Sequence, residues 1–259
     1  LIIVCIVSVL IVIKLLIKKL KISRGMSYLI AIGSTVCGTT AIIATAPVIN
    51  AKKSEISYAI ANMTVFGVLA MLIYPYFANF YFEGDPMFVG LFLGTAIHET
   101  SQVAAAGLIY DQQFNSPETL NISTVTKLIR NTFLVIMIPL FAYLYNRGQE
   151  HQKNYSIINI FPYFVLGFIA LIILRNVGDV FFLQTNISGK EMWVEFVDFV
   201  KSSAKIFLSM AMAAVGLSTN LKDLKSMGYK PFVVGFVSLL TVGVVSLTAI
   251  EFFNNLILN

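Results

Sequence analysis

The stretch GTAIHETSQ, residues 94–102, interrupts an otherwise apolar segment that covers residues 87–110. A second polar stretch, GSTVCGTT at residues 33–40, lies inside the apolar segment 28–49. Both segments are long enough to enter a lipid bilayer, since about 20 mostly apolar residues in a helix cross its hydrocarbon layer. Their small and polar centres indicate discontinuous helices, and non-helical backbone at membrane depth must be surrounded by protein or line a water-filled cavity. Two such interruptions are typical of inverted-repeat transporters.

The composition of the chain indicates an integral membrane protein. Of its 259 residues, 58% are hydrophobic and 12% are charged, and the mean hydropathy is +0.83. Soluble domains carry roughly 25% charged residues. Apart from the two interrupted segments, the apolar stretches of spanning length are 1–17, 56–80, 124–146, 157–175, 193–217 and 231–251. We therefore expect an all-α membrane protein: one polytopic domain, residues 1–259, with about six transmembrane helices plus the two interrupted segments.

The first residues, Leu1-Ile2-Ile3-Val4, include no initiator Met and no charged n-region of a signal peptide. We interpret them as the start of a span and expect further spans N-terminal to it. Cys5 and Cys37 lie far apart in apolar surroundings, which predicts two free thiols. The sequence contains no metal-ligand cluster, nucleotide-binding loop or Ser-His-Asp arrangement, so we expect neither an enzyme nor a protein that binds a metal or a cofactor.

The net charge of +5 comes mainly from basic residues between the apolar segments, which favours membrane orientation over nucleic-acid binding. A basic cluster at 14–24 follows the first span and predicts a cytoplasmic loop. Lys52 and Lys53 then favour a cytoplasmic position for the next loop, while Glu83-Gly84-Asp85 favours an external one. This alternation predicts that 28–49 and 87–110 are re-entrant hairpins entering from opposite sides. Two complete crossings by broken helices remain the alternative.

His98 and Glu99 are adjacent ionisable residues inside an apolar segment, and Gln102 follows one helical turn after His98. Ionisable groups at membrane depth cost roughly 2.5–3.5 kcal/mol each on insertion scales, so they indicate a functional site. A His–Glu pair suits proton transfer, because both groups can titrate near neutral pH in a buried setting. Alternatively, Glu99 pairs with His98 or a lysine and stabilises the bend.

The first interruption combines glycines with hydroxyl-bearing side chains. Gly33 and Gly38 permit non-helical backbone, and freed N–H groups could coordinate an anion while freed carbonyls could coordinate a cation. Close helix packing through small residues is the alternative. The candidate ligands in this interruption are Ser34, Thr35, Cys37, Gly38, Thr39 and Thr40.

Lys127 and Arg130 lie three residues apart in the external third of the expected 124–146 span. They could form a positive lip that attracts an anion. The alternative is that both side chains extend to the membrane interface.

Both interruptions resemble known signatures. The stretch GSTVCGTTAI at residues 33–42, with ATAPVI at residues 44–49, resembles the first signature of a bacterial inner-membrane family labelled as sulfate exporters. GTAIHETSQVAAAG at residues 94–107 resembles its second signature, and MAMAAVGL at residues 210–217 with LKDL at residues 221–224 is similar to a third. Lys127 and Arg130 fall where that family carries a basic pair. The resemblance covers essentially the whole chain and implies a place in the clan of cation–proton antiporters and anion transporters.

Together these features predict a secondary active transporter of a small anion, sulfate or a related oxyanion, in the bacterial plasma membrane. We expect His98, Glu99 and Gln102 to face residues 33–40, with the ionisable pair carrying a coupling proton or organising a coupling cation. The lipid bilayer surrounds the protein, nucleic acid is not a partner, and a homodimer is one possible assembly. A cation–proton antiporter, a symporter of another small solute and a channel are the alternatives.

Overall fold

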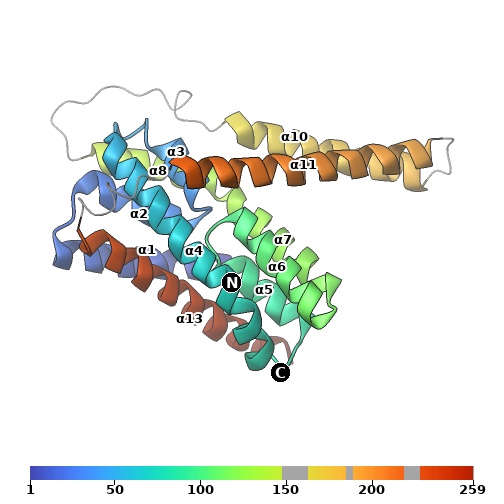
Figure 1. The fold of residues 1–259 in the computed structure, drawn as a ribbon, viewed down its shortest axis with the longest axis horizontal. Helices are drawn as coiled ribbons and strands as arrows, with labels where there is room; N and C mark the ends of the chain where they lie inside the picture. The colour runs from blue at the N-terminus through green and yellow to red at the C-terminus, as the bar shows by residue number, and fades with distance from the viewer. Residues whose placement is uncertain (148–162, 185–188, 219–227, 259) are drawn as a thin grey trace.

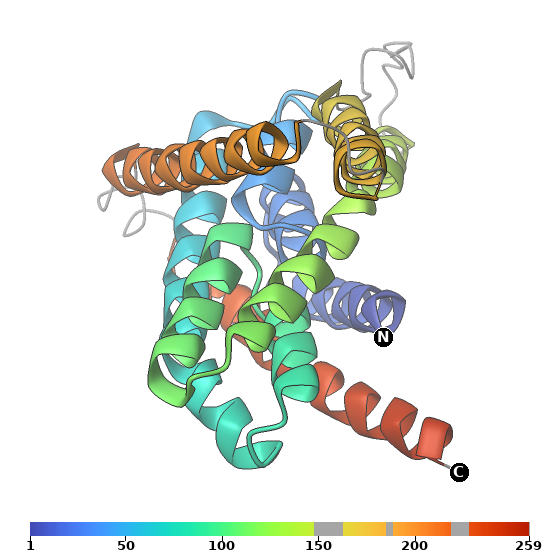
Figure 2. The same cartoon turned by 90° about the vertical axis from the view of Figure 1, so that its right-hand side faces the viewer.

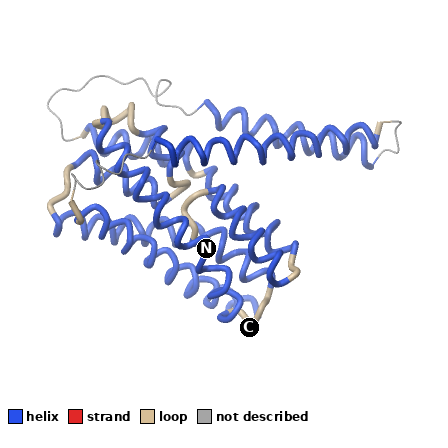
Figure 3. Tube along the Cα trace, viewed as in Figure 1, coloured by secondary structure: helices blue, strands red, loops and turns tan. Residues whose placement is uncertain are grey.

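A computed structural model describes residues 1–147, 163–184, 189–218 and 228–258 of the chain. The regular elements in these ranges are all helices, as Figure 3 shows by colour. They are α1 (Ile2–Leu20), α2 (Arg24–Thr35), α3 (Thr39–Thr45), α4 (Lys53–Tyr81), α5 (Pro86–Ala96), α6 (Thr100–Phe114), α7 (Pro117–Thr132), α8 (Leu134–Asn146), α10 (Tyr163–Gly178), η1 (Asp179–Gln184), α11 (Lys190–Ser218) and α13 (Lys230–Leu258).

Helix α4 runs the length of the bundle, and α13 lies parallel to it (Figure 1). At one end of the pair the Tyr58 hydroxyl donates to the carbonyl oxygen of Gly228 over 3.0 Å. At the other end the Tyr81 hydroxyl donates to Glu251 Oε1 over 2.5 Å. Residue numbers thus increase in the same direction along both helices. These two long helices define the two ends of the bundle.

The segment between α1 and α4 folds back on itself. Helix α2 starts beside the start of α4, where the Ser23 hydroxyl donates to Glu55 Oε1 over 2.6 Å. After the break that follows α2, helix α3 returns along it, because a Cβ atom placed on Gly33 would lie 2.9 Å from Ile42 Cδ1. The chain therefore re-enters α4 at the end of the bundle from which α2 departed.

The segment between α4 and α7 folds back in the same way from the opposite end. Helix α5 packs antiparallel to α4, with the Tyr74 and Phe92 rings 5.1 Å apart. Helix α6 runs parallel to α4, since Gln102 Nε2 donates to the carbonyl oxygen of Thr64 and the Tyr110 hydroxyl to Asn79 Oδ1. The turned view in Figure 2 shows α5, α6 and α7 as neighbouring rods, with α6 antiparallel to both α5 and α7. Residues 86–114 thus form a second hairpin.

The charged residues divide between the two ends of the bundle. The end where α2 and α4 begin carries Lys18, Lys19, Lys21, Arg24, Lys52, Lys53, Arg147 and Lys230, and Arg24 donates there to the last carbonyl oxygens of α8. The opposite end carries Glu83, Asp85, Asp111, Glu118 and Glu251. Because basic loops tend to stay in the cytoplasm, this distribution predicts that the first hairpin enters from the cytoplasmic side and the second from outside.

Three helices in the described ranges are long and apolar enough to cross a membrane: Lys53–Tyr81, the combined Pro117–Tyr145, and Lys230–Leu256. They correspond to the expected spans 56–80, 124–146 and 231–251. No described helix in the other expected spans, 1–17, 157–175 and 193–217, is both long and apolar enough to be counted with these three. Residues 157–162 lie outside the described ranges. The all-helical class is confirmed, whereas the number of spans stays a prediction.

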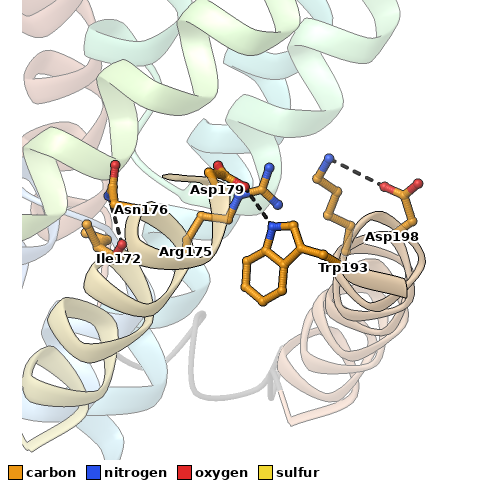
Figure 4. A network of polar contacts seen from close by, with 7 residues as sticks. Ile172, Arg175, Asn176, Asp179, Trp193 and Asp198 are labelled. Carbon is orange, nitrogen blue, oxygen red and sulfur yellow. Dashed lines mark hydrogen bonds and ion pairs between the residues drawn. The ribbon is translucent and has the colours of Figure 1, made fainter. Parts of the chain in front are cut away.

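Helices α10 and α11 extend beyond the rest of the bundle (Figure 1). A polar network around Asp179 joins them (Figure 4). Trp193 Nε1 donates to Asp179 Oδ1 over 2.9 Å, and Arg175 Nε donates to Asp179 Oδ2 over 2.7 Å. The Trp193 hydrogen bond and the Arg175 charge lower the pKa of Asp179. Asp198 and Lys201, three residues apart on the surface of α11, form an exposed ion pair.

The hairpin geometry makes a prediction about loop positions. Single-cysteine variants Lys21→Cys, Lys53→Cys and Glu83→Cys, in a background where Cys5 and Cys37 are Ser, should react with a membrane-impermeant maleimide from one side only. We expect Lys21→Cys and Lys53→Cys to be labelled from the cytoplasm and Glu83→Cys from outside. Labelling of Lys21→Cys and Lys53→Cys from opposite sides would show that residues 24–52 cross the membrane.

Candidate functional site

Each hairpin contains one helix break. Between α2 and α3 the chain leaves helical geometry at residues 36–38, and Gly38 has φ 61° and ψ −121°, a conformation that side chains disfavour. Between α5 and α6 the break covers residues 97–99, with Ile97 and Glu99 extended. The two breaks are related by one sequence offset. The ends of α2 and α5 are 61 residues apart (96 − 35), and so are the starts of α3 and α6 (100 − 39).

The two breaks touch each other. A Cβ atom placed on Gly38 would lie 3.5 Å from Glu99 Cβ and 3.7 Å from the carbonyl oxygen of His98. The hairpins come from opposite ends of the bundle, so their tips meet in its interior. The Thr39 side chain adjoins the Glu99 carboxyl at this contact. The stretches 33–40 and 98–102, which we expected to face each other, thus meet at one place.

A helix that ends inside a protein leaves its last carbonyl groups without intrahelical donors. Lys127, on α7, supplies donors to both breaks. Its Nζ atom donates to the carbonyl oxygens of Val36 and Ile97, each over 2.9 Å, and to that of His98. Val36 and Ile97 are equivalent positions under the 61-residue offset. An ammonium group has three N–H donors, so these three carbonyls use the full capacity of Lys127.

Arg130 lies one helical turn further along α7 and makes a similar set of contacts. Its Nε atom donates to Thr35 O over 3.0 Å, Nη1 to Thr95 O over 2.6 Å and Nη2 to Ser34 O over 2.8 Å. Ser34 and Thr95 are again equivalent under the same offset. Both basic side chains are 0% exposed. Together they hold six carbonyl oxygens at the ends of α2 and α5.

Helix α13 adds a third connection between the breaks. The Ser238 hydroxyl lies 3.0 Å from that of Ser34, and the Ser246 hydroxyl lies 2.5 Å from that of Thr95. Sequence reasoning missed these two serines. Their spacing of eight residues places them on one face of the 231–251 helix, and that spacing was the signal that could have identified them.

The structure corrects the interpretation of Lys127 and Arg130 as a surface lip, and equally the alternative of side chains at the interface. Helix α7 begins at Pro117, ahead of the expected start at residue 124. Lys127 therefore lies ten residues, roughly 15 Å, inside the helix. At that depth a basic side chain needs internal partners, and the carbonyls of the two breaks provide them.

The other predicted ligands separate into two groups. The Ser34 hydroxyl is paired with Ser238, and the Thr35 hydroxyl donates to the carbonyl oxygen of Ala31 over 2.9 Å. Cys37 is a buried free thiol, and the Thr40 side chain is exposed. The Ser34 and Thr35 hydroxyls thus already have partners within the protein.

The second group consists of buried polar side chains with unpartnered atoms. His98 is 0% exposed and Glu99 is 8% exposed. The unpartnered atoms are both ring nitrogens of His98, Glu99 Oε2, Gln102 Oε1 and Thr39 Oγ1. Buried polar atoms without partners are rare in proteins because they cost about 1–3 kcal/mol each. This group, beside the contact of the two breaks, is the candidate binding site.

Charge at the site is unbalanced. Lys127 and Arg130 contribute two positive charges, and Glu99 is the one acidic side chain among the described residues at the breaks. Glu55, the other buried acid in the described ranges, lies in the first turn of α4, where it caps the helix. The site therefore carries a formal excess of positive charge even when Glu99 is ionised.

Comparison with known proteins places these features in a family. The sequence profile of the family described as Conserved hypothetical protein 698 matches residues 1–235. The chain belongs to this family. Similar relatives include UPF0324 membrane proteins of Fusobacterium nucleatum (36% identity, 90% of this chain and 68% of the relative), Streptococcus agalactiae (35%, 95% and 71%) and Clostridium tetani (33%, 88% and 65%). No solved structure matches the chain.

Family membership and the three apolar helices identify the chain as a bacterial multi-pass membrane protein. The relatives are named as membrane proteins, and their names state no transported solute. The membrane location expected from composition is thus confirmed.

Gly38 should be sensitive to any side chain. Gly38→Ala places a Cβ atom in a disfavoured backbone conformation against Glu99, so we expect the free energy of unfolding to fall by about 1–3 kcal/mol. Gly167→Ala is the matched control, because Gly167 is an exposed helical residue with no atom within 4 Å of an added Cβ. That variant should be neutral or more stable. Thermal unfolding of the purified proteins measures both effects. An equal loss of stability in the two variants would contradict the positive-φ backbone conformation of Gly38.

Arg130→Lys should destabilise the protein although it keeps the charge. A lysine ammonium cannot reproduce the planar fork that reaches Ser34, Thr35 and Thr95. Each hydrogen bond lost from a charged group costs about 1.5–3 kcal/mol. The same change at the exposed Arg147 should leave the melting temperature unaltered. An Arg130→Lys protein as stable as the Arg147→Lys protein would show that the guanidinium contacts do not hold the breaks together.

Proposed function

We propose that this protein is a secondary active transporter of a small inorganic or organic anion, with sulfate and related oxyanions as the first substrates to test. One observation carries the proposal: two opposed helix breaks meet around two buried cations and one carboxyl group. Buried charges are expensive unless they are paired. An anion bound beside Glu99 and His98 would balance the positive excess that these residues leave.

The start of α6 supports an anion as the ligand. Helix N-termini offer free N–H groups and the positive end of the helix dipole. The Glu99 side chain, at the N-cap of α6, makes no capping hydrogen bond to these groups. The neighbouring His98 also has unpartnered ring nitrogens, and the unpartnered Thr39 hydroxyl adjoins the Glu99 carboxyl. Together they give hydrogen-bond donors from backbone, imidazole and hydroxyl for an oxyanion.

The relation between the breaks supports a transport cycle. Equivalent carbonyls of two hairpins that enter from opposite ends bind the same two side chains of α7. This arrangement agrees with an inverted repeat, in which the two halves exchange conformations and expose a central site alternately to each side. The 61-residue offset and the Ser238 and Ser246 contacts agree with it as well.

In this proposal, Glu99 binds the coupling proton and His98 adjoins it in the site. Protonation of Glu99 would increase the positive excess and so strengthen anion binding. Release of the proton on the other side would weaken it. Proton and anion would then move together, because each raises the affinity of the site for the other.

A cation–proton antiporter remains the second candidate, because the Glu99 carboxyl is buried and has an unpartnered oxygen. The carbonyl oxygens that would complete a cation site beside it are bound to Lys127 and Arg130. Two fixed positive charges nearby also oppose a mobile cation. The proposal therefore favours the anion.

Glu99→Gln is the decisive variant for the proposed function. Glutamine keeps the size and hydrogen bonding of the protonated carboxyl but cannot exchange a proton. The substrate is labelled sulfate, or whichever oxyanion in a screened panel is transported. We expect the increase in uptake that an imposed pH gradient causes to be at least tenfold smaller in Glu99→Gln than in the unaltered protein. The measurement is uptake into proteoliposomes at two external pH values.

The matched control is Glu195→Gln, at an exposed position of α11. It should transport like the unaltered protein. If Glu99→Gln keeps normal uptake and normal pH dependence, Glu99 does not couple protons. If no oxyanion is transported but Na⁺ or K⁺ drives proton exchange, the antiporter is the correct function.

A further inference from the structure

We propose that the Lys127 ammonium is a built-in substitute for a metal cation at the meeting point of the two breaks. In consequence the protein requires neither Na⁺ nor K⁺ there. The part that concerns transport rests on the proposed function. The part that concerns the cation position stands on the geometry alone.

Lys127 Nζ is surrounded by the kind of oxygen atom that binds metal cations. Its three partners are main-chain carbonyl oxygens, and they come from two separate hairpins. Carbonyl oxygens from unwound helices are the groups with which transporters hold coupling cations. They also replace the hydration shell of K⁺ in channels. An ammonium group is similar in size to K⁺ and carries the same charge, so this cage suits either ion.

The helix ends around Lys127 also favour a positive charge at its position. The carbonyls of Val36 and Ile97 follow the last turns of α2 and α5, which are the negative ends of two helix dipoles. Two negative ends facing each other in a buried place require a positive charge between them. Lys127 provides it from a third helix and is completely buried. A mobile cation would be needed there only if this charge were missing.

Lys127 has no remaining hydrogen-bond donor. All three N–H groups point to carbonyls, so the side chain cannot also bind a substrate through a hydrogen bond. It is therefore a positioning residue. It keeps the two breaks in contact while Glu99, His98, Gln102 and Thr39 remain for the ligand.

Lys127→Ala tests the inference by chemical rescue. The change removes three methylenes and the ammonium, and leaves the carbonyl cage without its cation. We expect a lower melting temperature that rises with added KCl or NaCl, or with n-propylammonium chloride, which matches the deleted atoms. At ten times the dissociation constant of the added cation, the rise should be roughly 3–6 °C. N-methylglucamine chloride at equal ionic strength should have no such effect.

Two variants serve as controls. Lys127→Met fills the space of the side chain without its charge, so propylammonium should not stabilise it. Lys201→Ala removes an exposed lysine of α11, and its melting temperature should not depend on which of the cations is present. If Lys127→Ala is stable enough to purify and none of the small cations stabilises it beyond Lys127→Met, the cage is not a cation position.

The unaltered protein gives an independent test if Lys127→Ala does not fold. Its melting temperature should be the same in Na⁺, K⁺ and N-methylglucamine chloride. A saturable stabilisation by Na⁺ or K⁺ would overturn the inference. Any transported oxyanion should likewise enter proteoliposomes equally fast in the three salts. Absence of oxyanion transport would contradict the proposed function and leave the melting result to decide this inference.

Discussion

Unpaired backbone carbonyls inside an apolar bundle are the constraint on which this structure depends. Water is absent from the hydrocarbon layer, so each carbonyl that a broken helix leaves free needs a donor from the protein. Lys127 and Arg130 supply six hydrogen bonds to the two breaks. Without these cations neither break could be buried. When Lys127 and Arg130 bind these carbonyl oxygens, the broken backbone can be buried and becomes a fixed part of the site.

The same interaction explains why α7 packs closely against α5. To bring Lys127 and Arg130 to both breaks, α7 must lie close to α5. Gly94 permits this approach, since a Cβ atom there would lie 2.6 Å from the carbonyl oxygen of Ser123. The position of the cations thus depends on a glycine of the signature in 94–102, and the two features act together.

The fixed cations also shape the chemistry that the site can perform. They neutralise the carbonyl ends of α2 and α5, and they leave the start of α6 and the unpartnered groups of His98 and Glu99 for a ligand. This division of roles differs from the expectation that the basic pair attracts substrate directly. In the structure, the pair binds backbone carbonyls, and in the proposed function its charge would act on the ligand through space.

The sequence by itself determined the membrane class, the places where helices break, and the ionisable pair. These features are local: apolar length, glycine and charge appear in consecutive residues such as 33–40 and 94–102. Loop charges such as Lys53 and Glu83 also favoured opposed hairpins, because lysine and arginine report the side of the membrane. Only the tertiary structure decided that the breaks touch, that Lys127 and Arg130 bind carbonyls of both, and that Ser238 and Ser246 join them. Those contacts connect residues far apart in the chain, and their geometry depends on how deeply α7 and α13 are placed in the bundle.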